Sequence, residues 1–511
     1  MIRSILMVST GTLASRLLGF ARDAMIAALL GAGAVVDAFL VAFQLVNVIR
    51  RLLTEGALNA ALIPAWARIN ALEGPDAAAA FAGRVLATIG AAVLVAALLI
   101  GLAMPFVIAA VAPGFIGEPT LQIAVDNARL MLPYLAFAGP VTVLMGLYNA
   151  QGRFALTAFS PLLFNGALIA VMTLLLVFPQ AATTAAMVMA ATVGIAGFLQ
   201  LSMLVLRQHS GRFAAPLRLT LDSQMRGFFA KALPGMVASS GPQLLIVGAA
   251  IVASSMPGAV SWLYFANRLI ELPLGIVGTA MGTVLIPELT RAARDEDHAL
   301  MTHAQSRGIE LAIGLTLPAT LGLIVLSTPI VRLLFEHGAF TASDTAATAQ
   351  AMVWLALALP AHVLIKALSP AFFARENTHT PLIATVIGLV VAIVAAYGLG
   401  ASFGASGIAA AIAIAAWSSA IALMIQGGRS FGWTIDADAQ RRLPLITLAA
   451  LAMGGLLWLL TRYMPSTDHK LAQAALLAAQ IACGLAIYAV PLLLTGALRW
   501  RDIRASLRKP A

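Results

Sequence analysis

The sequence predicts an all-α integral membrane protein with about 14 transmembrane helices. Hydrophobic residues make up 61% of its 511 residues and charged residues only 10%, and the mean hydropathy is +0.95. Long apolar runs recur from end to end, separated by breaks that are polar or contain Pro and Gly. A soluble protein does not need this much apolar surface, whereas a helix that crosses a membrane needs about 20 apolar residues.

The apolar runs divide into fourteen predicted spans. Gly31 and Gly33 lie between the first two spans, and a polar or Pro/Gly-containing break ends most of the others. We expect the spans at residues 4–31, 34–67, 83–111, 122–150, 157–178, 183–206, 227–254, 259–288, 306–335, 346–373, 380–401, 405–426, 443–462 and 471–497.

Arginine gathers in alternate breaks between the spans. If the first span starts inside, these breaks are all cytoplasmic, and the opposite breaks PQAATT, SSMPGA and EHGAFTASD hold neither lysine nor arginine. The arginines of the cytoplasmic breaks are Arg68, Arg84, Arg153, Arg207, Arg212, Arg218, Arg226, Arg291, Arg294, Arg307, Arg375, Arg429, Arg441 and Arg442. We therefore expect both termini to be cytoplasmic. The net charge of +10 then reflects topology and attraction to anionic lipid, not a nucleic-acid partner.

Two short patterns recur at nearly one spacing. ALIP ends at Pro64 and VLIP at Pro287, 223 residues apart, and YNAQGRFALTAFSP around Ala150 has a counterpart in FFARENTHTP around Ala374, 224 residues apart. Such an offset favours two parallel, pseudo-symmetric six-helix halves over a chance coincidence of short motifs. The predicted domains are residues 1–213, residues 214–428, and residues 429–511, which hold two additional helices and a basic cytoplasmic tail. The last two spans lack a counterpart in the first half and suit a surface that faces or binds lipid.

Ionisable residues concentrate in the first two spans and the eighth. A charge at bilayer depth costs at least about 2.5 to 3.5 kcal/mol on insertion scales, so these positions are functional candidates. They are Arg16, Arg22, Asp23, Asp37, Arg50, Arg51, Glu55, Arg268 and Glu271. Arginines outnumber acids, and the planar guanidinium suits phosphate. We expect the cluster to form an anion site that favours a diphosphate.

Local spacing also permits structural roles for these residues. Arg51 and Glu55 are four residues apart, and Arg268 and Glu271 three apart, so each couple can pair on one helix face. Arg22 and Asp23 could form a structural pair of the same kind, and Arg50 and Arg51 could extend to the cytoplasmic interface. Lys366 in the tenth span is a further intramembrane cation, and the sequence offers no obvious partner for it.

The remaining motifs argue against catalysis and metal chemistry. The sequence contains no GxxxxGK[ST] or HExxH motif, and its two GxSxG matches, at residues 400–404 and 428–432, do not follow a predicted strand, as a nucleophile elbow would. Its single cysteine, Cys483, excludes a multi-cysteine metal site, and His337, His362 and His379 are not at ligand spacing. We therefore expect a carrier without cofactors, driven by the membrane potential or an ion gradient, and not an enzyme.

Four stretches carry a resemblance to a known family. They are SRLLGFARDAMIAALLGAGAVVDAFLVAF, NVIRRLLTEGALNAALIP, SWLYFANRLIELPLGIVGTAMGTVLIPEL and FFARENTHTP. Together they resemble the MurJ (MviN) family of bacterial lipid II flippases in the multidrug/oligosaccharidyl-lipid/polysaccharide exporter superfamily. Two positions depart from the family pattern: Val46 precedes Asn47 where proline is usual, and Asn267 replaces a frequent acid.

The resemblance implies a function and a division of roles among the charged residues. It implies transfer of lipid II, undecaprenyl-diphosphate disaccharide-pentapeptide, from the inner to the outer leaflet of the bacterial cytoplasmic membrane by alternating access. Arg16, Arg22, Arg50 and Arg268 would bind substrate. Asp23, Asp37, Arg51, Glu55 and Glu271 would gate the pathway or position the arginines.

The same resemblance sets the expected partners and leaves competing functions open. Lipid II and membrane lipid are the expected partners, cell-wall synthesis enzymes are candidates, and the chain is expected to act as a monomer. The alternatives are an exporter of another polyprenyl-diphosphate oligosaccharide, a drug/cation antiporter of the same superfamily, and a non-transporting scaffold.

Overall fold

The computed structural model is helical throughout its described part, and no strand occurs there. It describes residues 2–54, 57–206, 214, 216–220, 222–223, 225–230, 241–294, 298–373, 375, 377–431, 435–463 and 469–495. By their contacts the helices form two units. The first unit is Met1–Ser261 with Gly338–Phe340, and the second is Trp262–His337 with Thr341–Ala511. The predicted boundaries at 213/214 and 428/429 follow from sequence repeats, and they stay a prediction.

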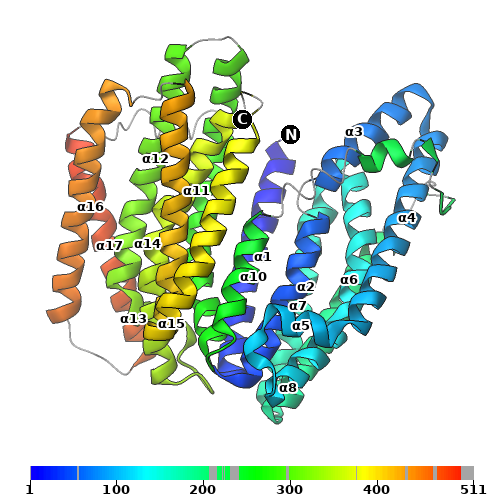
Figure 1. Cartoon of the computed structure of the whole chain (residues 1–511), viewed down its shortest axis with the longest axis horizontal. Coiled ribbons are helices and arrows are strands. Elements are labelled where there is room, and N and C mark those ends of the chain that lie inside the picture. The colour runs from blue at the N-terminus through cyan, green and yellow to red at the C-terminus, as the bar shows by residue number, and fades with distance from the viewer. Residues whose placement is uncertain are drawn as a thin grey trace. The chain divides into compact units, whose positions relative to one another are not determined.

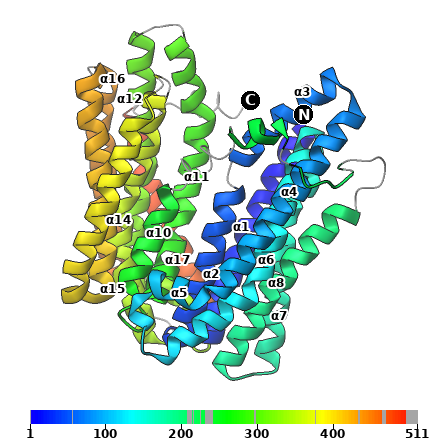
Figure 2. The same cartoon turned by 45° about the vertical axis from the view of Figure 1, so that its right-hand side comes forward.

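The first unit is a bundle around one central helix (Figures 1 and 2). Its elements are α1 (Ile2–Leu30), α2 (Ala34–Thr54), α3 (Ala57–Leu72), α4 (Pro75–Leu102), α5 (Met104–Val111), the 3-10 turn η1 (Pro113–Phe115), α6 (Pro119–Ala150), α7 (Phe154–Val177), α8 (Ala182–Leu206) and α10 (Gly241–Ala253). Helix α6 packs against α2, α4 and α8, and α1 packs along α7. Most of α6 is therefore buried inside the unit.

The second unit is a bundle in which α12 and α14 hold the outer helices together. Its elements are α11 (Ala259–Arg294), whose first three residues belong to the first unit, and α12 (His298–Val325), α13 (Ser327–Phe335), α14 (Ala342–Phe373), α15 (His379–Phe431), α16 (Ala437–Tyr463) and α17 (Lys470–Leu494). Helix α14 packs against α12 and α15, and α16 packs against α12 and α17. Gly404 interrupts α15 with a φ of 61°, between the predicted spans 380–401 and 405–426.

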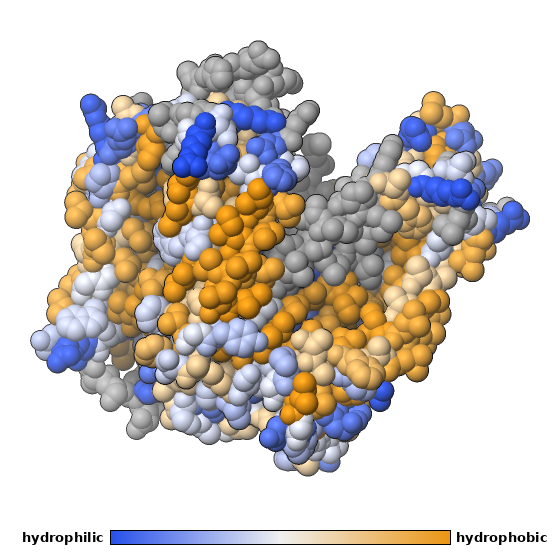
Figure 3. All heavy atoms as spheres, in the orientation of Figure 1, coloured by the Kyte–Doolittle hydropathy of each residue, from blue (hydrophilic) through white to orange (hydrophobic). Residues whose placement is uncertain are grey.

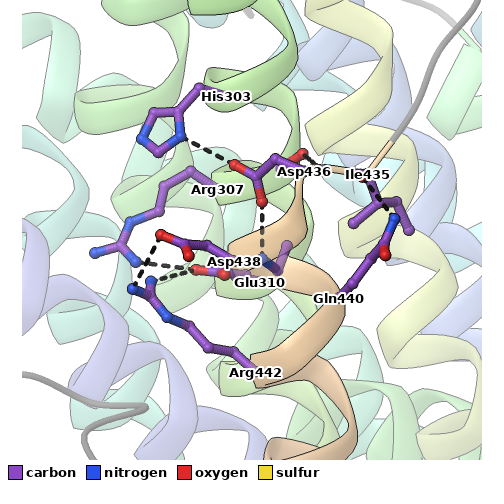
Figure 4. A network of polar contacts seen from close by, with 10 residues as sticks. His303, Arg307, Glu310, Ile435, Asp436, Asp438, Gln440 and Arg442 are labelled. Atoms are coloured by element: carbon purple, nitrogen blue, oxygen red, sulfur yellow. Dashed lines mark hydrogen bonds and ion pairs between the residues drawn. The ribbon is translucent and has the colours of Figure 1, made fainter.

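Helix α16 is joined to α12 by a network of polar contacts (Figure 4). Glu310, only 7% exposed, accepts hydrogen bonds from Arg307 Nη1 at 2.9 Å and from Arg442 Nη1 at 3.4 Å. Asp436 accepts the Ala439 backbone N–H at 2.7 Å, which caps the start of α16, and its other carboxylate oxygen lies 3.0 Å from His303 Nδ1.

Helix α17 is fastened to α12 in the same unit. The Tyr488 hydroxyl donates to the Gly314 carbonyl at 2.5 Å, inside an apolar cluster of Ile313, Ile446, Ala449 and Leu492. The C-terminal helix pair is therefore attached to α12 by both charged and apolar contacts.

The long apolar helices confirm a multi-pass membrane protein. Within the described residues, nine helices are long and apolar enough to cross a membrane: α4, α6, α7, α8, α12, α14, α15, α16 and α17. Apolar surface covers the middle of the helices in view, and hydrophilic residues gather toward helix ends (Figure 3). Large apolar side chains stand exposed on α4 and α15, among them Leu94, Leu98, Val386, Val390 and Val394. Lipid tails can cover such a surface. The count of fourteen spans stays a prediction.

Two predicted spans were wrong as single helices. Residues 83–111 break at Ala103 before the proline that opens α5, and residues 306–335 break at Leu326 before the proline in the first turn of α13. The predicted span 34–67 covers α2 and α3, and the two residues between them, 55 and 56, lie outside the described residues.

Candidate functional site

Arg22 of α1 lies in a buried polar and aromatic cage in the first unit. Its Nε and Nη2 donate to Asp23 Oδ1 at 2.9 and 2.7 Å, and its Nη1 donates to Asn165 Oδ1 at 3.0 Å. The guanidinium carbon lies 5.0 Å from the ring centre of Phe43 and 5.9 Å from that of Phe164. Arg22 is 8% exposed and Asp23 is 0% exposed. The ion pair that the sequence allowed between these neighbours is therefore present, and it holds the guanidinium in place.

Arg16 occupies the opposite environment on the same helix. It is exposed, and it makes no hydrogen bond or ion pair with the part of the chain that the structure describes. Arg16 and Asp23 are seven residues apart and share a helix face, so this face of α1 passes from packed to open along its length. An exposed arginine at this depth of a hydrophobic helix is available to an anion.

Arg50 and Arg51 lie half-buried on α2. Arg50 Nε donates to Asn47 Oδ1 at 3.4 Å, and the Asn47 side chain donates in turn to the Phe43 carbonyl at 2.9 Å. Asn47 thus orients Arg50 from one turn away. Glu55, the predicted partner of Arg51, lies outside the described residues.

Asp37 joins the first turn of α2 to the first turn of α11. Its Oδ2 accepts the Gly258 N–H at 2.6 Å and its Oδ1 accepts the Ser261 N–H at 2.9 Å. Asp37 is 1% exposed, and all three residues belong to the first unit. The carboxylate therefore acts as a helix cap supplied by another helix, and its charge is favoured by the N-terminal end of the α11 dipole.

A close backbone contact lies at the end of α1 in the same unit. The Ala339 N–H donates to the Ala28 carbonyl at 2.8 Å. Gly31 and Gly338 flank this contact with φ angles of 69° and 58°, in the left-handed region that favours glycine. A Cβ on Gly31 would lie 2.5 Å from the Ala339 carbonyl oxygen, so a side chain there would force the two segments apart.

Arg268 and Glu271 form the predicted pair on α11 in the second unit. Arg268 Nη1 donates to Glu271 Oε2 at 2.9 Å, and Asn267 Nδ2 donates to Glu271 Oε1 at 3.3 Å. The pair is partly exposed, with side-chain exposures of 22% for Arg268 and 35% for Glu271. Asn267 thus supplies a second donor to the same carboxylate.

The contacts add residues that sequence reasoning missed. Asn165 of α7 contacts Arg22 and also donates to the Ser15 carbonyl of α1 at 3.1 Å, so it binds two helices together. Asn47 and Ser261 were missed in the same way. An amide inside the apolar run of α7 was the available signal, because polar groups at bilayer depth need partners. In the described part of the chain, no group of three or more His, Cys, Asp or Glu residues could hold a metal ion.

Comparisons with known proteins agree with this architecture. The family model described as "Lipid II flippase MurJ" matches residues 26–473. The probable lipid II flippase MurJ of Rhizobium meliloti (strain 1021) is 35% identical over 518 residues, covering 100% of this chain and 97% of the relative. The lipid II flippase MurJ of Burkholderia cenocepacia is 33% identical, with 77% of each chain covered.

Solved structures share the fold. A structure described as lipid II flippase MurJ in an inward closed conformation matches with a TM-score of 0.79 at 22% identity, covering 98% of this chain and 100% of that one. An inward-facing multidrug resistance MATE transporter matches with a TM-score of 0.66 at 15% identity, covering 83% of this chain and 97% of that one. The family match across most of the sequence and the relative at 35% identity together establish that the chain belongs to the lipid II flippase MurJ family.

Proposed function

We propose that this chain is a flippase that moves lipid II from the inner to the outer leaflet of the bacterial cytoplasmic membrane by alternating access. The observation that carries the proposal is membership of a family whose relatives are named lipid II flippases over the full length of this chain. The arginines at bilayer depth support it, since a diphosphate headgroup needs cations to cross the hydrocarbon core. The proposed activity is transport, with no covalent step and no cofactor.

The arginines of the proposed headgroup site differ in their exposure and in how firmly neighbouring side chains hold them. Exposed Arg16 and half-buried Arg50 would reach the diphosphate directly. Arg22 would act from a fixed position, since Asp23 and Asn165 hold its guanidinium before substrate arrives. Such preorganisation lowers the ordering cost of binding.

In the second unit, Arg268 would contribute from α11, and Glu271 would position it. The Glu271 carboxylate accepts hydrogen bonds from both Arg268 and Asn267, so the arginine side chain is oriented before an anion binds. Arg51 and Glu55 stay proposed gating or positioning residues.

We assign the outer gate to the Asp37 contact and the adjoining glycine contact. Asp37 ties α2 to the start of α11, and the Gly31 and Gly338 segments meet through their backbones. Under the topology proposed from the arginine distribution, with both termini cytoplasmic, these contacts lie at the outer ends of their helices. Opening them would release the headgroup outward.

We assign the polyprenyl tail to the lipid-exposed faces of α16 and α17. Both helices carry exposed apolar side chains, including Leu448, Leu451, Leu471, Ile481 and Leu485. A tail in contact with these faces stays in lipid while the headgroup crosses. The membrane potential or an ion gradient would reset the empty carrier, and a monomer suffices for this cycle.

The deciding experiment depletes the protein in its host and measures how much lipid II is accessible in the outer leaflet. The proposal expects outer-leaflet lipid II to fall while total lipid II is maintained or rises. Unchanged outer-leaflet lipid II would support a scaffold instead. Binding of cationic dyes by the purified protein, with no binding of lipid II, would favour the antiporter alternative.

A further inference from the structure

A second contact holds the turn that Asp37 binds. The turn consists of residues 254–258 and joins α10 to α11 in the first unit. Its first residue, Ser254, is 5% exposed, and its hydroxyl accepts the Gly114 backbone N–H of η1 at 3.0 Å. The same hydroxyl donates to the Ile251 carbonyl in the last turn of α10 at 2.7 Å. Ser254 therefore links the end of α10 to the segment between α5 and α6.

The backbones of η1 and this turn lie directly against each other. A Cβ built on Gly114 would meet backbone atoms of Ser254 and Ser255, so a side chain at this position would push the two segments apart. Helix α10 packs against both α5 and η1, and these two elements pack against α6. The neighbouring Phe115 is 4% exposed. Because α6 is the central helix of the first unit, η1 gives the turn a fixed support.

The turn is short and is held together by its own backbone hydrogen bonds. The Met256 N–H donates to a carbonyl at the end of α10, and the Met256 carbonyl accepts the first N–H of α11, both at 3.1 Å. Gly258 has a φ of 83°, in the left-handed region that favours glycine. A displacement of Ser254 is therefore transmitted to Gly258, whose N–H donates to Asp37.

A purely local role for Ser254 would be to cap α10. The bond to Ile251 suffices for that role, whereas the Gly114 donor comes from a segment 140 residues away. Under the topology proposed from the arginine distribution, the break between α5 and α6 and the turn between α10 and α11 both lie on the outer side. The contact between Gly114 and Ser254 thus belongs to the same side of the membrane as the Asp37 contact.

We propose that Ser254 is a positioning residue of the outer gate. It holds the turn against η1, so that the Gly258 and Ser261 N–H groups stay aligned with the Asp37 carboxylate. The inference rests on the proposed function, because that function assigns the outer gate to Asp37. In the closed state the turn is held from two sides, by η1 and by α2, and outward opening separates it from both.

Hydrogen–deuterium exchange of the purified full chain, followed by mass spectrometry, tests this role. The observed quantity is the exchange rate of the segment that contains the Gly258 and Ser261 N–H groups, which reports local opening. Ser254→Ala should raise this rate by about threefold to tenfold, the factor expected for the loss of one hydrogen bond. Asp37→Ala should raise it further. Adding Ser254→Ala to Asp37→Ala should change the rate little, because both substitutions open the same contact.

Two further variants complete the test. Gly114→Ala disturbs the contact from the side of η1 and should raise the same exchange rate at least as much as Ser254→Ala. Ser160→Ala is the matched control, since it removes a buried hydroxyl near the start of α7 and should leave the rate unchanged. Faster exchange confined to Gly114 and the last turn of α10 would show a local cap and overturn the proposal. Independent, multiplying effects of Ser254→Ala and Asp37→Ala would overturn it as well.

The lipid II assay separates this inference from the proposed function. If Ser254→Ala changes the exchange as expected but depletion of the protein leaves outer-leaflet lipid II unchanged, the positioning role stands and the proposed function fails. If depletion lowers outer-leaflet lipid II but Ser254→Ala leaves the exchange rate unchanged, the proposed function stands and the positioning role is refuted.

Discussion

Replacing Asp37 by alanine should open the junction between α2 and α11. The carboxylate accepts two backbone N–H groups, from Gly258 at 2.6 Å and from Ser261 at 2.9 Å, and all three residues are buried. A buried donor left without its partner costs about 1–3 kcal/mol, and loss of a helix cap costs about 0.5–2 kcal/mol. Allowing for overlap between these terms, we expect a loss of about 2–4 kcal/mol from the closed state, which raises the open population by about 30-fold to 900-fold.

A buried thiol at the start of α11 can measure that population. Val260 is 3% exposed, so a Val260→Cys reporter in a Cys483→Ser background should react slowly with a maleimide while the junction is closed. Asp37→Ala should accelerate labelling by the factor above. Asp37→Asn keeps one acceptor oxygen and should give an intermediate rate. Asp76→Ala, which removes an exposed acid at the start of α4, is the matched control. A labelling rate unchanged by Asp37→Ala would refute the reasoning.

Three further predictions concern the headgroup site and the bundle. Arg16→Ala, Arg50→Ala and Arg268→Ala should each abolish complementation of a depleted strain at normal membrane abundance, and normal growth with all three replaced would contradict an anion site. Gly338→Ala should slow growth in the same assay, since its φ of 58° costs a non-glycine residue about 1 kcal/mol or more before any clash. Asn165→Leu should lower the midpoint of thermal unfolding in detergent, because it removes a hydrogen-bond partner from Arg22 and from a carbonyl of α1, at about 1–3 kcal/mol. A midpoint equal to that of the unmodified protein would exclude that role.

Local spacing predicted the contacts that form within one helix. The Arg268–Glu271 pair follows from a separation of three residues, and the break at Gly404 coincides with a gap between apolar runs. An ion pair within one helix and the end of a helix both depend on residues that are close together in the sequence. The spacing of residues along the chain is therefore enough to predict them.

Contacts between distant segments left no such pattern. Asn165 is 143 residues from Arg22, and Ser261 is 224 residues from Asp37. An amide or a backbone N–H can satisfy many acceptors, and periodicity says only which face is apolar, not which helix will cover it. The predicted spans 83–111 and 306–335 were wrong for a related reason, since an apolar pattern that continues across Ala103 and Leu326 does not report where the helix is interrupted.

The polar network between α12 and α16 has a consequence for biosynthesis. Glu310 leaves the ribosome 132 residues before Arg442, a delay of roughly 7 to 26 s at about 5–20 residues per second. During that interval Glu310 has only Arg307 of this network beside it, and Asp436 does not yet exist to meet His303. The second unit therefore cannot complete its buried contacts until the last helix pair has been made. A chain released before α16 is made would leave Glu310 without Arg442 and His303 without Asp436.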